Sequence, residues 1–298
     1  MNKWKKLHNY RINCFDIINV YMCEIRPIVK WAGGKTQLLD RLKDRMPKKY
    51  GSYYEPFIGG AALLLNIQPK KASINDINTE LINTYTQIRD DAPSVKTLLK
   101  YLDDNHTGEE YYYQKRDEFN IKIQNKEYDS YMAALFIYLN KHCFNGLYRV
   151  NSKGLFNVPY NNKDKGKSFD EENIDSLSEY LKNVKMMNGD FETCAKKAKI
   201  GDFVFFDSPY APLNPTSFES YTKEGFSKQD HERLANLFKE LDKKGVYCML
   251  TNHNTELINE LYKDYNIEVV AVKRMINSKA SNRKGEEVII TNYKYATN

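Results

Sequence analysis

Residues 203–210 read Phe-Val-Phe-Phe-Asp-Ser-Pro-Tyr. The first four form a continuous apolar run, which is typical of a strand buried on both faces of a parallel sheet. An acid and an aromatic residue follow at once, where the strand would reach the carboxyl edge of the sheet. Ligands of open α/β sheets bind at that edge. The stretch therefore predicts an α/β fold with Asp207 and Tyr210 beside a binding cleft.

The segments before this strand alternate between strand and helix patterns. Residues 53–57 and 72–76 read as strands, and residues 61–67 between them read as a helix. Residues 27–31 read as a further short strand or extended piece, and Asn78 stands where a helix N-cap is expected. Strands that alternate with helices predict a parallel, doubly wound sheet.

The same alternation resumes near the C-terminal end. Strands are predicted at 185–187 and 246–250, and a helix begins at Ser227 with the spacing of a capping box. The last two strand patterns, 267–272 and 288–292, are joined by a polar loop with no helix pattern. We therefore expect these two strands to pair antiparallel.

The middle of the chain lacks this alternation. Residues 91–183 are rich in Tyr, Asn and Lys and contain one strongly apolar helix at 131–140. We expect an inserted, mostly helical domain there. Residues 25–90 and 184–298 would then form one domain, preceded by an extension at 1–24.

Composition limits the classes of protein that fit. The chain has 298 residues, 41% hydrophobic and 28% charged, and no apolar run approaches the ~18 residues of a membrane helix. The net charge is +6, with eight basic and two acidic residues in 26–50 and six basic and two acidic in 273–294. Such clusters suit phosphate contacts, but they are equally typical of solvated helix faces.

Cysteine usage and the N-terminus argue for a cytoplasmic protein. The five cysteines are widely spaced, with no C-x-x-C pair, so neither disulfides nor a zinc or other metal site are expected. Residues 1–24 resemble a signal peptide only loosely, because polar residues break the apolar stretch. Met22 is an alternative start, because the motifs begin just after it.

Two glycine turns follow the first predicted strands. Residues 31–36, Trp-Ala-Gly-Gly-Lys-Thr, suggest a nucleotide P-loop, but Val29 stands where a Walker A motif needs glycine, so a P-loop ATPase is rejected. Residues 55–60, Glu-Pro-Phe-Ile-Gly-Gly, are followed by Asp76, 21 residues after Glu55, at the spacing of a ribose-binding acid. A bound adenosine moiety and a purely structural turn stay about equally open here. The missing G-x-G-x-x-G argues against NAD or FAD.

The loop at 207–210 suggests chemistry on an exocyclic amine. The amino nitrogen of a base is a poor nucleophile because its lone pair is delocalised into the ring. A carboxylate and a backbone carbonyl that accept its two hydrogens would localise the lone pair and stabilise the developing positive charge. Tyr210 would stack on a base turned out of the duplex. A turn acid and a core aromatic are the structural alternatives.

The order of six motifs resembles the Dam-type DNA adenine methyltransferases, the alpha group or D12 class. These motifs are Trp-Ala-Gly-Gly-Lys, Glu-Pro-Phe-x-Gly-Gly, Asn-Asp, Asn-Gly-Leu-x-Arg-x-Asn, Gly-Asp-Phe and Asp-x-Pro-Tyr, between Pro27 and Tyr293. The resemblance implies a Rossmann-like, mainly parallel sheet with an antiparallel C-terminal pair, and the insertion as target-recognition domain. It implies S-adenosyl-L-methionine as methyl donor and adenine N6 in double-stranded DNA as acceptor, with GATC as the expected site. We expect a monomer or weak dimer, in a restriction-modification or orphan role.

The resemblance also assigns residues. The catalytic loop is Asp207, Ser208, Pro209 and Tyr210. The cofactor contacts cluster at the glycine turns and strand ends: Trp31, Ala32, Gly33, Lys35, Glu55, Phe57, Gly59, Asp76, Asp190, Phe191 and Asp207. The DNA contacts are Lys30, Phe144, Asn145, Leu147, Arg149, Asn151 and Pro159.

The chemistry of the DNA set agrees with that assignment. Arg149 can make a bidentate contact to guanine, Leu147 can touch a thymine methyl, and Phe144 can wedge into the base stack. Neighbouring lysines would add salt-dependent affinity. A polar surface turn is the structural alternative for this Asn-Gly stretch.

One departure concerns the catalytic loop. The family's loop normally reads Asp-Pro-Pro-Tyr, whereas this chain has Ser208 in the second place. Serine keeps the backbone carbonyl but frees φ, so we expect a looser loop and slower turnover, with activity retained. The rival hypothesis is a DNA-binding module that has lost turnover. Transfer to cytosine N4 is a third possibility, whereas cytosine C5 chemistry is excluded because no proline precedes a cysteine.

Overall fold

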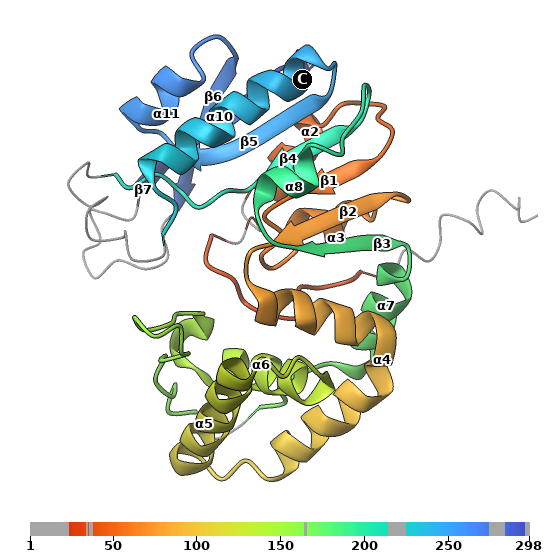
Figure 1. Ribbon diagram of the computed structural model, residues 1–298, viewed down its shortest axis with the longest axis vertical. Helices are drawn as coiled ribbons and strands as arrows, with labels where there is room; N and C mark the ends of the chain where they lie inside the picture. Colours follow the sequence, from red (N-terminus) through yellow and green to blue (C-terminus); the bar gives the residue numbers. More distant parts are fainter. Residues whose placement is uncertain are drawn as a thin grey trace, which may run out of the picture.

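A single seven-stranded sheet organises the part of the chain that the computed structural model describes, which is residues 24–33, 35, 38–163, 166–213, 225–273 and 284–295. The strand order is β3-β2-β1-β4-β5-β7-β6 (Figure 1). The strands are β1 Tyr53–Glu55, β2 Ala72–Asp76, β3 Val184–Asn188, β4 Phe203–Phe206, β5 Tyr247–His253, β6 Asn266–Lys273 and β7 Lys284–Thr291.

Strand pairing confirms the predicted mixed, mainly parallel sheet. Strands β1 to β5 pair in parallel, and β7 runs antiparallel to both β5 and β6. The sequence did not reveal that β7 lies between β5 and β6. Burial explains this order, because Val288 and Ile290 of β7 are fully buried whereas Val269 of the edge strand β6 is exposed.

The two faces of the sheet carry separate apolar clusters. Along β4, Phe203 and Phe205 pack on one face, and Val204 and Phe206 on the other, as alternation in a strand requires. One face is covered by α8 (Phe191–Ala195), α10 (Lys228–Lys243) and α11 (Glu256–Leu261), and Figure 1 shows α10 lying across the sheet. The other face packs against α2 (Leu39–Arg45) and α3 (Ala62–Ile67). Helices therefore cover both faces, as a doubly wound fold predicts.

Helical structure dominates the middle of the chain, as predicted. Figure 1 shows these helices beside the β3 end of the sheet; they are α4 (Thr79–Asp104), α5 (Glu109–Asn125), α6 (Ser130–His142) and α7 (Glu171–Leu181). The Asn78 side chain caps α4 by accepting from the Leu81 N–H at 2.7 Å, which confirms the predicted N-cap. Helix α4 kinks at Asp91, just before Pro93, whose ring cannot continue the helical hydrogen bonds. The apolar contacts of α4, α6 and α7 are continuous with one face of the sheet.

The segment at 27–31 forms no strand in the described chain and bends at residues 28 and 29, so the strand alternative for it is wrong. Side-chain amides bind the backbone of Lys30 within this segment and of Arg26 just before it. Asn173 of α7 accepts from the Arg26 N–H at 2.8 Å and donates to the Arg26 carbonyl. Asn140 of α6 makes the same pair of bonds with the backbone of Lys30. These bonds place the first glycine turn between the sheet and the helical region.

Membrane-spanning helices and metal-binding groups are both absent from the described residues. No helix among them is long and apolar enough to cross a membrane, and no group of His, Cys, Asp or Glu in them could hold a metal ion. Cys143, Cys194 and Cys248 are buried and unpaired. Met22, Cys14 and Cys23 lie outside the described residues.

Candidate active site

The loop after β4 meets the first glycine turn at Asp207. The Asp207 carboxylate accepts from Thr251 Oγ1 at 2.9 Å and forms an ion pair with Lys35 Nζ at 2.5 Å, both through Oδ1. The Lys35 side chain is only 4% exposed, and its Nζ also donates to the Gly33 carbonyl at 2.6 Å. The first glycine turn and the loop after β4, which are far apart in the sequence, are therefore in direct contact through a charge-assisted hydrogen bond.

Tyr210 lies beside this ion pair. Its hydroxyl donates to Glu287 Oε2 at 2.8 Å, and Lys35 Nζ lies 4.6 Å from the centre of its ring. The ring edge meets His253, with the ring centroids 4.7 Å apart. Burial raises the pKa of the Tyr210 hydroxyl well above its usual value, and the carboxylates of Asp207 and Glu287 raise it further. Tyr210 is therefore a neutral, fixed aromatic surface next to the acid.

The sequence-based site omitted the residues that support this loop. Thr251, Asn252 and His253 end β5, and Glu287 lies opposite His253 on β7. A signal was present, because a polar Thr-Asn-His run follows the apolar part of β5 at the carboxyl edge of the sheet. Glu287 had no such signal, since its position depends on the order of the antiparallel strands.

The second glycine turn fits closely against Trp31. Gly59 has a φ of +46°, and a Cβ there would lie 2.6 Å from Trp31 Cδ1. A Cβ on Gly60 would lie 3.3 Å from Trp31 Cβ. The Trp31 ring in turn stacks on Tyr148, with centroids 5.6 Å apart. Trp31 therefore links the second glycine turn to the segment that carries the predicted DNA contacts, and glycine is required by both conformation and space.

Glu55, at the start of the second glycine turn, is a buried acid. Glu55, 2% exposed, accepts from the Tyr53 hydroxyl at 2.6 Å. Burial raises the pKa of Glu55 to about 8, an effect that the Tyr53 hydrogen bond reduces and the charge of Asp207 increases. Glu55 is therefore mostly protonated at neutral pH.

Asp76 joins the second turn to the start of α4. Its two carboxylate oxygens accept from the backbone N–H groups of Gly59 at 3.1 Å and Asn78 at 3.0 Å. Burial raises the pKa of Asp76, although both hydrogen bonds oppose that shift. The next residue, Ile77, is 77% exposed, a large apolar side chain that the sequence analysis did not single out.

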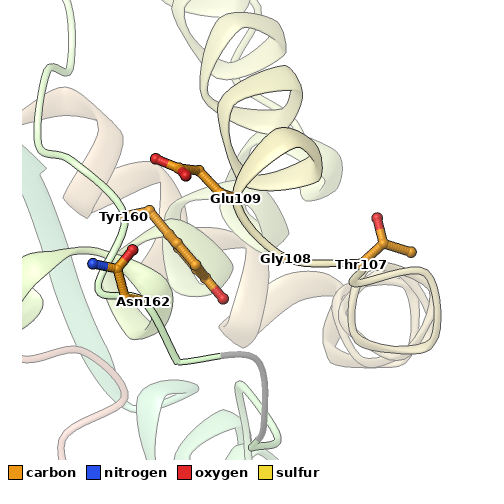
Figure 2. Close-up of a pocket in the computed structure, with 5 residues that line it drawn as sticks. All are labelled: Thr107, Gly108, Glu109, Tyr160 and Asn162. Atoms are coloured by element: carbon orange, nitrogen blue, oxygen red, sulfur yellow. The ribbon is translucent and has the colours of Figure 1, made fainter.

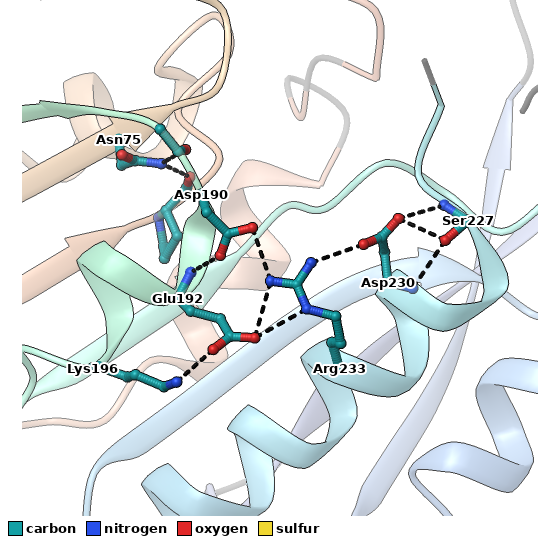
Figure 3. Close-up of polar contacts among 9 residues, drawn as sticks. Asn75, Asp190, Glu192, Lys196, Ser227, Asp230 and Arg233 are labelled. Carbon is teal, nitrogen blue, oxygen red and sulfur yellow. Dashed lines mark hydrogen bonds and ion pairs between the residues drawn. The ribbon is translucent and has the colours of Figure 1, made fainter. Parts of the chain in front are cut away.

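An ion-pair network fixes the predicted segment at Asp190 (Figure 3). Arg233 of α10 bridges three carboxylates, those of Asp190 at 2.9 Å, Glu192 at 3.1 Å and Asp230 at 2.9 Å. Asp190 also caps α8 by accepting from the Glu192 N–H. The capping box that was predicted at Ser227 and Asp230 is present, so the network is anchored at the start of α10.

Phe191 connects this network to the second glycine turn. Its ring stacks on Phe57, with centroids 5.2 Å apart, and the Arg233 guanidinium lies 4.9 Å from its centre. Ala32 and Gly33, in the first glycine turn, are exposed. The residues predicted to contact a cofactor therefore come from the carboxyl ends of β1, β2, β3 and β4 and from the first glycine turn.

The predicted DNA contacts lie on the loops after α6. Phe144, 52% exposed, and Asn145, with a φ of +58°, belong to the short turn η1 (Phe144–Gly146). The Phe144 N–H donates to the carbonyl of the exposed Pro159 at 2.8 Å. The Lys30 side chain crosses this turn so closely that a Cβ on Gly146 would lie 2.5 Å from Lys30 Cδ. The structure thus brings Lys30 to the turn from more than a hundred residues away.

The remaining predicted DNA contacts differ in exposure and in the hydrogen bonds of their side chains. Arg149 is exposed, and its guanidinium donates to Asn157 Oδ1 at 2.8 Å. Leu147 is half-buried. Asn151 uses its side-chain oxygen to close its own turn by accepting from the backbone N–H groups of Lys153 and Leu155. Asn157 therefore holds the Arg149 guanidinium, whereas Asn151 shapes the loop.

Two surface hollows lie away from this site. One, of about 300 Å³, is lined by polar residues near the start of α5, including Glu109, Tyr160 and Asn162 (Figure 2). The other, of about 570 Å³, is lined by residues such as Tyr50 and Asp202 at the amino ends of the strands. The second is therefore at the sheet edge opposite Asp207, and neither includes a predicted site residue.

Comparison with known proteins identifies the family. The family model described as D12 class N6 adenine-specific DNA methyltransferase matches residues 31–276. The chain is 48% identical to Type II methyltransferase M1.LlaDCHI of Lactococcus lactis subsp. cremoris, over 90% of this chain and 96% of that protein. It is 44% identical to Type II methyltransferase M.MjaIII of Methanocaldococcus jannaschii, over 91% and 100%. It is 33% identical to the DNA adenine methylase of Escherichia coli K12, over 90% and 95%. The chain belongs to the D12 class of N6 adenine-specific DNA methyltransferases.

Proposed function

We propose that this enzyme moves a methyl group from S-adenosyl-L-methionine to adenine N6 in double-stranded DNA at GATC. The observation that carries the proposal is the arrangement at Asp207. Lys35 and Thr251 both contact its Oδ1, which leaves Oδ2 as an acceptor, and the neutral ring of Tyr210 lies beside it. A carboxylate next to an aromatic surface at the carboxyl edge of the sheet suits a flipped base.

The residues around the two glycine turns fit the methyl donor. A turn without side chains, the buried acid Asp76, the stacked pair of Phe57 and Phe191 and the exposed Ile77 offer polar and apolar partners suited to an adenosine group. We assign Trp31, Lys35 and Asp190 to the same site. When bound, S-adenosyl-L-methionine supplies an electrophilic methyl group on a sulfonium.

The catalytic loop would activate the amino nitrogen. Asp207 and the backbone carbonyl of Ser208 accept the two N–H hydrogens of the flipped adenine, so the lone pair localises on nitrogen. Tyr210 holds the base by stacking, and Lys35 holds the Asp207 carboxylate in place through their ion pair. After transfer, Asp207 accepts one proton from the methylated nitrogen and passes it to solvent. Preorganised acceptors of this kind supply much of an enzyme's rate enhancement.

The DNA-binding loops would provide sequence recognition. Arg149 is exposed and oriented by Asn157, as a bidentate contact to guanine requires. Phe144 is the exposed wedge, and Lys30, whose side chain lies against Gly146 of the same turn, would contact a phosphate. The GATC assignment rests on the Asn-Gly-Leu-x-Arg-x-Asn motif of residues 145–151. The target-recognition domain would be residues 91–183, inserted into the catalytic domain of 25–90 and 184–298.

Labelled S-adenosyl-L-methionine and short duplexes test the proposal. Purified protein should label a GATC duplex in the adenine N6 position and leave a GTTC duplex unlabelled. The Asp207→Ala variant should fold and label neither duplex. Binding to GATC without label would refute the enzymatic assignment for this chain, and labelled cytosine N4 would refute the choice of atom.

The biological setting can be tested in cells. The relatives of this chain include proteins named Type II methyltransferase and proteins named DNA adenine methylase. A restriction-modification role and an orphan role are therefore both candidates. We expect a cytoplasmic monomer or weak dimer. DNA from cells that express the protein should resist a restriction enzyme blocked by N6-methylated GATC, and full sensitivity would overturn the proposed site.

A further inference from the structure

Three consecutive side chains at the end of β5 support the catalytic loop. Thr251 donates to Asp207, and Asn252 contacts both Ser208 and the backbone of Ala211. His253 Nδ1 lies 2.8 Å from the Ala211 carbonyl oxygen. The loop 207–211 is therefore held by hydrogen bonds to side chains of the neighbouring strand β5.

Asn252 spans this loop with a single amide. Its Nδ2 donates to Ser208 Oγ at 3.3 Å, and its Oδ1 accepts from the Ala211 N–H at 2.8 Å. The same oxygen accepts from the His253 N–H at 2.9 Å. Asn252 is fully buried and Ser208 is 2% exposed, so these bonds are shielded from water. The amide closes the loop across Pro209 and Tyr210.

Ser208 leaves the backbone of the loop less restrained than a proline would, so the bridge made by the Asn252 amide matters more. Pro209 keeps the residue before it in the extended region, but a serine at 208 still has a broad range of φ there. A proline at 208 would fix that φ near −65°. Asp207 and Tyr210 flank this position, and a displacement of about 1 Å in reacting groups can cost ~100-fold in rate. The loop needs a restraint from outside its own backbone.

We propose that Asn252 is a positioning residue for methyl transfer, which holds loop 207–211 in its working geometry because position 208 carries no proline ring. Asn252 is fully buried and bonded to the loop, so it would act on transfer through the loop. The proposal rests on the proposed function, since the property it affects is the rate of transfer.

Three variants and one matched control test the proposal. Asn252→Ala removes the bridge, Ser208→Pro supplies a backbone restraint, and the double variant combines them. Asn254→Ala is the control, because Asn254 follows the same strand but contacts Glu286 and Asn259 instead of the loop. For each protein we would measure the single-turnover transfer rate, the dissociation constants for donor and GATC duplex, and thermal unfolding.

The expected pattern separates positioning from simple stability. Asn252→Ala should lower the transfer rate by roughly 10- to 100-fold and change both dissociation constants by less than about 3-fold. The same substitution should cost clearly less in the Ser208→Pro background, and Asn254→Ala should have no effect on the rate. An equal cost in both backgrounds, or no loss of rate, overturns the proposal.

Two further measurements keep the test decisive. If Asn252→Ala does not fold, Ser208→Ala removes only the acceptor of the Asn252 amide and should slow transfer by roughly 2- to 10-fold, the value of one hydrogen bond. An unchanged rate in that variant overturns the proposal.

If the wild-type protein transfers no methyl group, the proposed function has failed, and hydrogen exchange of the Ala211 amide still reports on Asn252. Faster exchange in Asn252→Ala then supports the restraint, and unchanged exchange overturns it.

Discussion

Replacing Glu55 with glutamine should flatten the pH dependence of stability. Glu55 is buried, and its pKa of about 8 in the folded protein compares with 4.5 when exposed. Between these values the folded protein holds a proton that the unfolded chain has released, so the free energy of unfolding falls as pH rises. The contribution is fully present below about pH 4.5 and is lost as pH rises through about 8. Each pH unit well below 8 costs about 1.4 kcal/mol, and the loss tapers as the folded acid itself deprotonates, which gives roughly 2 kcal/mol between pH 6 and pH 8.

Urea unfolding at pH 6, 7, 8 and 9 measures this effect. Wild-type protein should lose roughly 3 kcal/mol more than Glu55→Gln across the range, because glutamine keeps an oxygen for the Tyr53 hydroxyl and carries no charge. Groups other than Glu55 affect both proteins alike. Glu260→Gln, an exposed acid paired with Lys263, is the control and should follow the wild-type curve. Parallel curves for wild type and Glu55→Gln would show that Glu55 is not a protonated buried acid.

Three other substitutions test separate parts of the site. Arg233→Ala should raise KM for S-adenosyl-L-methionine about 3- to 10-fold with little change in kcat, because it releases Asp190 and Phe191 by breaking a partly exposed network. Steady-state kinetics check this, and a loss confined to kcat would contradict it. Gly59→Ala should cost about 1–3 kcal/mol of stability and weaken donor binding, since its Cβ would lie 2.6 Å from Trp31 Cδ1. Unchanged thermal unfolding would count against that packing. Arg149→Ala should cost about 1–3 kcal/mol of discrimination between GATC and a duplex with the guanine replaced, measured as a ratio of kcat/KM. An equal loss on both duplexes would assign Arg149 to phosphate contact instead.

Local sequence patterns predicted strand positions and helix caps. The strand at Phe203–Phe206 has the predicted boundaries, and Asn78 and Ser227 cap helices as expected. These features depend on residues within one strand or within three or four positions of a helix end. Their physical causes, alternation and capping, are contained in short stretches of sequence.

The motifs also placed the acid and the two glycine turns at one sheet edge. The fold therefore brings Asp207 near the first turn, but the sequence could not show that Lys35 binds its carboxylate. It also could not show that Asn140 and Asn173 hold the segment at 27–31, which was expected as a strand or extended piece. Such contacts depend on which surfaces pack together, and residue spacing does not encode that.

The sequence by itself determined the alternating elements, the family and the residue types available for chemistry, because these follow from local periodicity and from motifs in order. Only the tertiary structure decided that β7 separates β5 from β6 and thereby puts Glu287 against Tyr210. Only the fold showed that Arg233 joins α10 to the segment at Asp190, and that Asn252 closes the loop around Ser208. Strand order and long-range polar contacts are set by burial of the whole sheet and by the pairing of buried polar groups, which no single segment specifies.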